Sequence, residues 1–183
     1  MDFQPHDARA VANLLLDRAE EHGAPISNLA LQKLLYFAHG VFLVRHKQPM
    51  ITGHFVAWQH GPVHPTVYET FKSAGAKPIT FRATRRDYRM RTEFALPTPD
   101  DPEVKQVVGD VVRNLAKLPA SRLVDMSHVE GGPWHAVVNE IRTGEGLGLR
   151  IRDSVVLARF RRHWLAVNSE ADPGGPLEDA PFA

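Results

Sequence analysis

Apolar side chains recur at helical spacing over most of the chain. In residues 8–22 they include Val11 and Leu14, which fall on one face of a helix. Asp7 stands where its side chain can cap the first turn, and Gly23 follows as a stop. The pattern predicts a first helix over residues 8–22.

Residues 29–46 are apolar nearly all the way round a helix. Ser27 or Asn28 can cap its start, and Pro49 closes it. The apolar positions are Leu31, Leu34, Leu35, Phe37, Ala38, Val41, Phe42 and Leu43. Because a helix that is apolar on every side must be covered on every side, we expect this one to be the buried centre of the fold.

Further helices are predicted in the second half of the chain. Asp101 as the N-cap and Pro102 as the first residue open an amphipathic helix that Pro119 terminates. Its apolar stripe consists of Val104, Val107, Val108, Val111, Leu115 and Leu118. A short helix is expected over residues 121–126, and another begins at Pro133.

The C-terminal region divides into a last helix and a tail. The helix is predicted over residues 153–167, after a glycine-rich turn at residues 143–148. It is expected to bury Val156, Phe160 and Trp164. Residues 168–183 are acidic and rich in proline and glycine, a composition that cannot bury enough apolar surface to offset the entropy of ordering. We therefore predict a domain over residues 1–167 and a disordered acidic tail.

Strand patterns are short. Side chains alternate over residues 53–58, and we predict a strand there that Gly61–Pro62 ends. Its partner is the stretch around Met50 and Ile51, or a strand further along the chain. The next helix begins at Pro65 and stops at Gly75. Its buried side is expected to hold Val67, Tyr68 and Phe71.

Between residues 77 and 99 the helical spacing disappears, and one or two strands with an exposed basic loop are predicted. Together with the helices, this indicates a mainly α (α+β) fold. We expect a compact helical domain around a buried central helix, with a small β-sheet or hairpin.

Composition narrows the class of protein. Basic and acidic side chains number 22 and 21, so the net charge of +1 gives the whole chain no electrostatic drive toward nucleic acid or membrane. The absence of cysteine excludes disulfides and thiolate zinc sites. Asp2 and Asp7 precede the first apolar run, which is the wrong order for a signal peptide, and the uncharged run 34–44 is too short to span a bilayer. We expect a soluble cytoplasmic protein.

Three histidines, His54, His60 and His64, lie close together in the chain. His60 and His64 have the spacing of two metal ligands on one helical face, but Pro62 and Pro65 interrupt that helix. A metal site here would have to recruit further ligands from a distant segment, and His128 and Glu130 are the candidates. We expect turn histidines, no metal and no cofactor.

Residues 127–135 could be drawn as a catalytic cluster of Ser127, His128, Glu130 and His135. The chain has no Gly-x-Ser-x-Gly elbow and no phosphate-binding loop of the Walker type. We expect no catalytic residue, and a histidine-dependent hydrolase is the weakest of the alternatives.

The segment 82–91 concentrates arginine around Tyr88. Such a stretch can bind nucleic acid or an acidic protein, or it can solvate a strand edge and discourage aggregation. Tryptophans beside turns, such as Trp58, can anchor a protein interface. We expect partner contacts from Arg82, Arg85, Arg86, Arg89, Trp58 and His60.

Four segments in order resemble the Panacea domain, the family of SocA-like antitoxins and GepA-type phage-associated proteins. They are VANLLLDRA, ISNLALQKLLYFAHG, AWQHGPVHPTVYETF and SHVEGGPWHAV. The resemblance extends over roughly residues 8–165, and the length and tail are most similar to the SocA-like members. It implies a mostly helical domain that neutralises a neighbouring toxin by direct contact and, for SocA-like members, delivers the toxin to the ClpXP protease as an adaptor.

The matched positions carry no catalytic role in the family, so the resemblance implies a binding protein and not an enzyme. We expect these positions to form a scaffold: Gln32, Lys33, Tyr36, Gly61, Pro62, Tyr68, His128, Glu130, Pro133 and Trp134. A DNA-binding autoregulator of its own operon remains the main alternative, supported by the arginine stretch alone.

Overall fold

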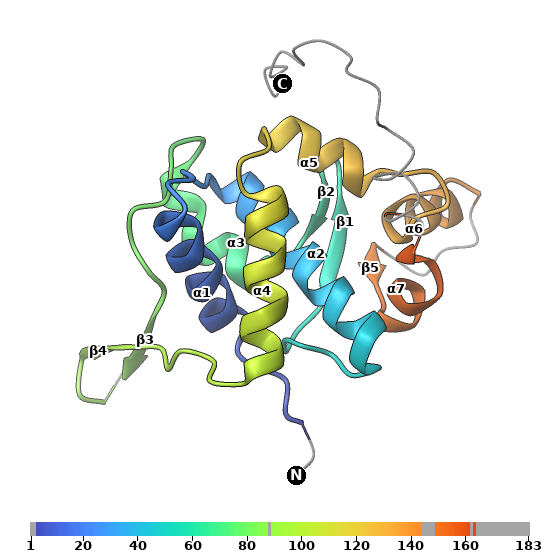
Figure 1. Cartoon of the computed structure of the whole chain (residues 1–183). Helices are drawn as coiled ribbons and strands as arrows, with labels where there is room; N and C mark the ends of the chain where they lie inside the picture. Colours follow the sequence, from blue (N-terminus) through green and yellow to red (C-terminus); the bar gives the residue numbers. More distant parts are fainter. Residues whose placement is uncertain (1–2, 88, 144–148, 162, 164–183) are drawn as a thin grey trace.

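Helices pack around one central helix in the computed structural model, which describes residues 3–87, 89–143, 149–161 and 163 (Figure 1). The central helix is α2 (Asn28–His46). On one side of it lie α1 (Ala8–Glu21) and α4 (Pro102–Leu115), and toward the other lie α6 (Pro133–Arg142) and α7 (Asp153–Arg159). Both α3 (Pro65–Phe71), continued by the 3-10 turn Lys72–Ala74, and α5 (Ala120–Ser127) also contact α2. The predicted mainly α (α+β) fold is confirmed.

Small antiparallel sheets complete the fold. In one of them, β1 (Phe55–Trp58) lies between β2 (Gly61–Val63) and β5 (Arg150–Ile151). The other is the hairpin of β3 (Thr84–Asp87) and β4 (Thr92–Ala95), which projects away from the helical body in Figure 1. This hairpin confirms the strands and exposed basic loop predicted for residues 77–99.

The helices begin where the caps predict. Asp7 Oδ1 accepts a hydrogen bond from the Arg9 N–H at 2.8 Å, and Asp101 Oδ1 accepts one from the Glu103 N–H at 2.8 Å. Ser27 Oγ accepts from the Ala30 N–H at 3.3 Å, so Ser27 caps α2. Each contact satisfies a backbone donor that the first turn of a helix leaves free.

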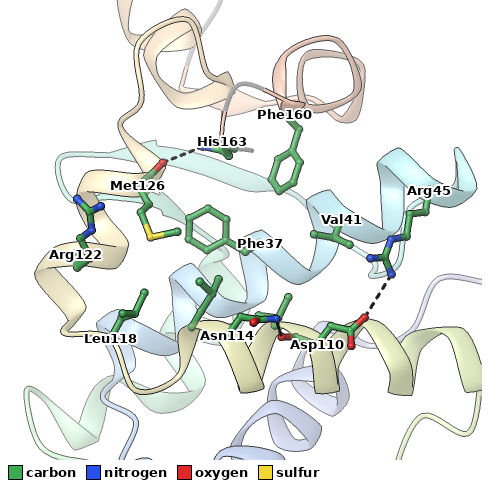
Figure 2. Close-up of a pocket in the computed structure, with 12 residues that line it drawn as sticks. Phe37, Val41, Arg45, Asp110, Asn114, Leu118, Arg122, Met126, Phe160 and His163 are labelled. Carbon is green, nitrogen blue, oxygen red and sulfur yellow. Dashed lines mark hydrogen bonds and ion pairs between the residues drawn. The ribbon is translucent and has the colours of Figure 1, made fainter. Parts of the chain in front are cut away.

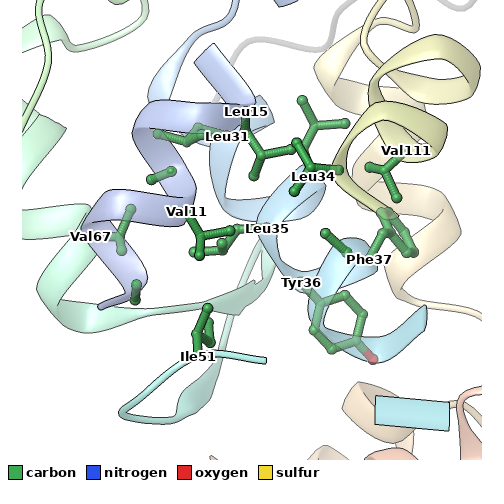
Figure 3. Packing of buried hydrophobic residues seen from close by; sticks show 14 of the residues in the cluster. Val11, Leu15, Leu31, Leu34, Leu35, Tyr36, Phe37, Ile51, Val67 and Val111 are labelled. Atoms are coloured by element: carbon green, nitrogen blue, oxygen red, sulfur yellow. The ribbon is translucent and has the colours of Figure 1, made fainter. Parts of the chain in front are cut away.

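The core confirms the buried central helix. Every residue from Ala30 to Gly40 is buried. Figure 3 shows Leu31, Leu34 and Leu35 of α2 beside Val11 and Leu15 of α1 and Val111 of α4. On the opposite side of α2, aromatic rings meet edge to face around Tyr36: Phe55, Phe160 and His163. These packing partners of α2 come from segments that are far apart in the sequence: α1, β1, α4 and the residues after α7. The central helix therefore joins the N-terminal, middle and C-terminal parts of the described chain.

The first predicted strand is correct and ends at Trp58, before Gly61–Pro62, but a strand at Gly61–Pro62 was not predicted. Gly61–Pro62 do not end the sheet, because they form β2, and Trp58 pairs directly with Gly61 across a turn at Gln59 and His60. Gly61 enters the strand with a φ of +92°, which glycine tolerates, and β2 is an edge strand, where the missing N–H of proline is tolerated. Met50 and Ile51 are not partners of β1; the second partner is β5, the strand further along the chain.

Helix ends differ from prediction by a few residues. The helix predicted to reach Pro119 ends at Leu115, and Pro119 instead precedes the first turn of α5. In a continued helix the ring of Pro119 would clash with the carbonyl of Leu115, four residues earlier, which is consistent with an end at Leu115. Val156 of α7 and Phe160, which directly follows this helix, are buried as predicted. Trp164, the remainder of the predicted last helix, residues 144–148 of the glycine-rich turn and the tail 168–183 lie outside the described residues.

Within the described ranges, no helix has both the length and the apolar character needed to cross a bilayer.

Candidate functional site

Lys33 of the central helix has its whole side chain buried. Its Nζ donates a hydrogen bond to the carbonyl oxygen of Pro62 at 2.9 Å. Burial disfavours the charged amine and lowers the pKa of Lys33 to about 7. The lysine therefore works as a polar link between α2 and β2, inside the protein rather than on its surface.

Gly61 lies against this link and has no room for a side chain. A Cβ there would lie 2.4 Å from Ser127 Oγ and 3.0 Å from Lys33 Cε. Ser127 is itself buried, and its hydroxyl donates to the Val124 carbonyl oxygen at 2.7 Å within α5. The segment GPV thus passes close between α2 and α5, and both its backbone dihedrals and its packing require glycine.

Four aromatic side chains form a cluster above this link, which we call the aromatic joint: Trp58, Tyr68, His128 and Trp134. The rings of His128 and Trp134 stack with centroids 3.8 Å apart and an interplanar angle of 18°. Trp134 Nε1 donates to the carbonyl oxygen of Trp58 at 2.9 Å, and the rings of Trp58 and Tyr68 meet edge to face at 4.9 Å. Trp58 remains 38% exposed. The joint therefore holds an exposed tryptophan on a fixed backbone.

His128 is neutral at neutral pH in this arrangement. Its pKa is lowered to about 4, first by burial and then by electrostatic repulsion from Lys33 and His60. His60 lies half-buried in the turn between β1 and β2. Three of the four segments that carry the family resemblance thus meet at one place, although they lie far apart in the chain.

Gln32 and His64 form a second polar link to the same strand. Gln32 Oε1 accepts a hydrogen bond from the His64 N–H at 2.9 Å, and His64 Nε2 donates to the Thr52 carbonyl oxygen at 3.0 Å. Burial lowers the pKa of His64. His64 is a buried scaffold residue, whereas His54 is exposed.

Tyr36 makes a buried contact that sequence reasoning missed. Its hydroxyl donates to His163 Nε2 at 3.1 Å, while His163 Nδ1 donates to the Met126 carbonyl oxygen at 2.9 Å. Since a carbonyl can only accept, Nδ1 carries the proton of the neutral ring. Burial lowers the pKa of His163 to about 4. The local sequence FRRHW gave no signal for this role, because the contact joins residues 127 positions apart.

Pro133 is the first residue of α6, as predicted, and it places Trp134 in the first turn. Glu130 is exposed, and within the described residues its carboxylate makes no hydrogen bond or ion pair. His135 Nδ1 accepts a hydrogen bond from the Gly131 N–H at 3.2 Å. Of the motif residues in this segment, Pro133 and Trp134 thus begin α6, and Glu130 lies at the surface.

The predicted arginines lie on a different surface from the aromatic joint. Arg82 is paired with two acids of α1 at the surface, with Nε 2.6 Å from Asp17 Oδ1 and Nη2 2.6 Å from Glu20 Oε2. Arg85, Arg86 and Arg89 are exposed on the hairpin β3–β4, and their side chains make no hydrogen bond or ion pair within the described residues. Arg82 therefore secures the base of the hairpin, and the other three remain available.

The residues considered for catalysis do not form a nucleophile–base pair. Within the described residues, no hydrogen bond joins the Ser127 hydroxyl to a histidine, and the His128 ring packs flat on Trp134. In the same part of the chain, no group of three or more His, Asp or Glu side chains is placed to hold a metal ion. What the arrangement provides is a rigid surface with exposed aromatic area.

An apolar groove of about 570 Å³ lies elsewhere, between α2, α4 and α5. Figure 2 shows Phe37 and Met126 directed into it, with the Arg45–Asp110 ion pair at one end and Arg122 at the other. None of the candidate site residues predicted from the sequence lines this groove.

The fold is a mainly helical domain. Its motif residues around Lys33, Gly61 and Trp134 form a buried scaffold beneath the partly exposed aromatic joint. Residues 31–135 match the family described as "Antitoxin SocA-like, Panacea domain". The chain is 47% identical over 180 residues to "Antitoxin SocA" of Caulobacter vibrioides (strain NA1000 / CB15N), an alignment that covers 98% of this chain and 96% of that protein. The chain therefore belongs to the SocA-like Panacea family. No solved structure matches it significantly.

Proposed function

We propose that this protein is the antitoxin of a toxin–antitoxin pair and that it neutralises its toxin by binding it directly. The full-length relationship to an antitoxin supports the assignment. The observation that carries the binding mode is the aromatic joint, in which buried contacts are used to hold Trp58 at the surface. Proteins that act by binding depend on such anchored, partly exposed aromatic side chains.

Trp58 is well suited to anchor a partner. The preceding residues of β1, Phe55 and Ala57, are buried, so the strand is fixed in the core up to its last residue. The Trp58 carbonyl is held by Trp134, and its ring leans on Tyr68. Because the side chain is already ordered, a partner that covers it loses little further conformational entropy on binding.

We extend the proposal to the adaptor role, in which the antitoxin presents the bound toxin to the ClpXP protease in the cytoplasm. An adaptor must hold two proteins at once and so needs two separate surfaces. Besides the aromatic joint and the hairpin β3–β4, the described residues offer the apolar groove between α2, α4 and α5, which none of the residues of the joint or the hairpin lines. The arginines of the hairpin also keep operon DNA as a second candidate partner.

The first test is binding of the protein encoded by the adjacent reading frame. Purified wild-type antitoxin is expected to bind it, and Trp58→Ala is expected to weaken the equilibrium affinity at least tenfold, about 1.4 kcal/mol, with an unchanged thermal midpoint. Trp58→Phe keeps an aromatic anchor and should retain most of the affinity. Failure of the wild type to bind would refute the antitoxin proposal, while equal binding by Trp58→Ala would remove only the joint from the interface.

The adaptor role has its own test. Toxin loss is followed in a reaction with ClpXP and ATP, with and without the antitoxin. Faster loss in the presence of wild-type antitoxin is expected. If the antitoxin binds the toxin and toxin loss is not accelerated, neutralisation occurs by sequestration alone.

A further inference from the structure

The hairpin β3–β4 has no buried face. All four residues of β4 and three of the four in β3 are exposed. An isolated two-stranded hairpin is marginally stable in water, because it lacks a third strand or a packed face. A segment of this kind is stabilised when a partner covers it.

The base of the hairpin is nevertheless fixed to α1. Asn13 Oδ1 accepts from the Ala83 N–H at 2.8 Å, and Asn13 Nδ2 donates to the Ala83 carbonyl oxygen at 2.9 Å. The paired side chains of Arg82, Asp17 and Glu20 lie beside this contact. The hairpin is thus presented from a defined position, although its strands are open to solvent.

The strand register divides the arginines between two faces. Arg85 pairs with Phe94, and Arg86 pairs with Glu93. Directly opposed residues share a face and successive residues alternate. One face therefore combines Arg85 with Phe94, which is 47% exposed, and with Asp87, whose Oδ1 accepts the N–H groups of Arg89 at 2.8 Å and Met90 at 3.1 Å. The other face combines Arg86 with the carboxylate of Glu93 directly opposite it.

These two faces differ in what they can bind. Arginine beside an aromatic ring is the composition enriched at the centre of protein interfaces. An arginine opposite Glu93 already has a nearby carboxylate to offset its charge. The Arg85–Phe94 face is therefore the better site for a protein partner, and its free guanidinium fits a carboxylate.

The turn of the hairpin shows a further unusual feature. Arg91 has a φ of +49°, in the left-handed region that glycine or asparagine adopts at lower cost. Beside it, the Met90 side chain is 71% exposed. Unfavourable backbone conformations of this kind are concentrated at functional sites, and both residues lie in the turn of the same hairpin, beyond the Asp87–Thr92 pair.

We propose that the Arg85–Phe94 face of the hairpin binds an acidic surface of the toxin, with Phe94 as the apolar anchor. The proposal rests on the proposed antitoxin function, because it names the chemistry of that same partner. Four arginines between residues 85 and 91 set the charge of the hairpin, which complements carboxylates.

A protein partner fits this surface better than nucleic acid does. Asp17 and Glu20 lie at the base of the hairpin, Asp87 within β3 and Glu93 on its other face. A phosphate backbone running along the hairpin would meet these carboxylates repeatedly. A protein partner can instead place its few carboxylates at Arg85 and other side chains opposite these acids.

The two faces supply a matched pair of variants for the test. Arg85→Glu and Arg86→Glu make the same charge change at adjacent exposed positions of one strand. Both are expected to slow association with the adjacent-frame protein at low salt, because both alter electrostatic steering. At high salt, which screens steering, Arg86→Glu should regain the wild-type affinity, whereas Arg85→Glu and Phe94→Ala should each remain weakened about tenfold or more.

Equal effects of Arg85→Glu and Arg86→Glu at both salt concentrations, or no effect of either with Phe94→Ala, would overturn the proposal and leave the antitoxin function standing. A wild type that does not bind the adjacent-frame protein would remove both. A duplex from the region upstream of the gene serves as the competing probe. The hairpin would be assigned to DNA if the wild type binds this duplex, if Arg85→Glu and Arg86→Glu abolish that binding equally, and if neither variant changes the affinity for the toxin. Unchanged thermal midpoints of the variants show that the domain remains folded.

Discussion

The buried amine of Lys33 donates a hydrogen bond to the carbonyl oxygen of Pro62 at 2.9 Å and joins the central helix to an edge strand. A lysine in this position keeps a pKa of about 7 because burial disfavours its charge. The stability of the domain must then depend on pH in the alkaline range.

We expect the free energy of unfolding to rise between pH 7 and about pH 10. In that window the unfolded chain holds the Lys33 proton and the folded chain has released it, so raising the pH favours the folded state. Lys33→Met should flatten this rise in urea titrations performed at a series of pH values. Tyr36 cannot produce the same effect, because burial raises its pKa and acts in the opposite direction at higher pH. An equal rise in Lys33→Met would contradict the assignment.

Acid should destabilise the protein through His163. Its folded pKa of about 4 lies below the usual 6.5, so the unfolded chain binds more protons as the pH falls from about 6.5 to 4. At about 1.4 kcal/mol per pKa unit, His163 accounts for at most about 3 kcal/mol of the decrease in the free energy of unfolding. His163→Gln, which does not titrate, is expected to reduce the loss, and His54→Gln at an exposed position is the control. The result that counts against this account is an identical acid profile for His163→Gln and the wild type.

Alanine substitutions at Gly23 and Gly61 can distinguish the cost of backbone strain from the cost of overpacking. Gly23 and Gly61 both have positive φ, but a Cβ at Gly23 meets no atom within 4 Å, whereas one at Gly61 meets Ser127 Oγ at 2.4 Å. Gly23→Ala should therefore cost about 1 kcal/mol from strain, and Gly61→Ala roughly 1–3 kcal/mol more from overpacking. The double variant Gly61→Ala/Ser127→Ala should recover part of the difference in chemical denaturation. Equal losses at the two glycines would argue against the close contact.

Helical glycines provide a second contrast. A Cβ at Gly40 would lie 2.0 Å from the ring of the buried Phe160, while one at Gly109 meets nothing within 4 Å. Gly109→Ala is expected to stabilise the domain by about 0.5–1 kcal/mol through helix propensity. Gly40→Ala should instead destabilise it, because α7 must move away from α2. Calorimetric midpoints that shift in the same direction for both variants would show that the packing against Phe160 is not limiting.

Deletion of residues 168–183 tests the domain boundary predicted from composition. The segment offers few apolar side chains, so its removal is expected to leave the thermal midpoint nearly unchanged. A fall of more than about 5 °C, roughly 1–2 kcal/mol for a domain of this size, would place the segment within the folded unit.

The sequence alone predicted the helices and the buried centre, because their signals are local. Asp7, Ser27 and Asp101 cap the helices that they precede. Pro65 is the first residue of α3, and Pro133 is the first residue of α6. Spacing within one helix decides which face is apolar, so the all-round apolar pattern of residues 29–46 was sufficient to predict the central position of α2. The family resemblance likewise selected residues that the structure brings together.

The tertiary structure alone decided what those residues do, since their contacts join distant parts of the chain. Lys33 reaches Pro62 across 29 positions and Trp134 reaches Trp58 across 76, and neither separation leaves a periodic signal. The local sequence predicted that Gly61–Pro62 would end a strand, because glycine and proline usually interrupt secondary structure. Pairing with β1 makes these two residues a strand instead, because an edge strand tolerates both. The register of β3 and β4 likewise separates Arg85 from Arg86, since a shift of one residue moves every side chain to the opposite face of the hairpin.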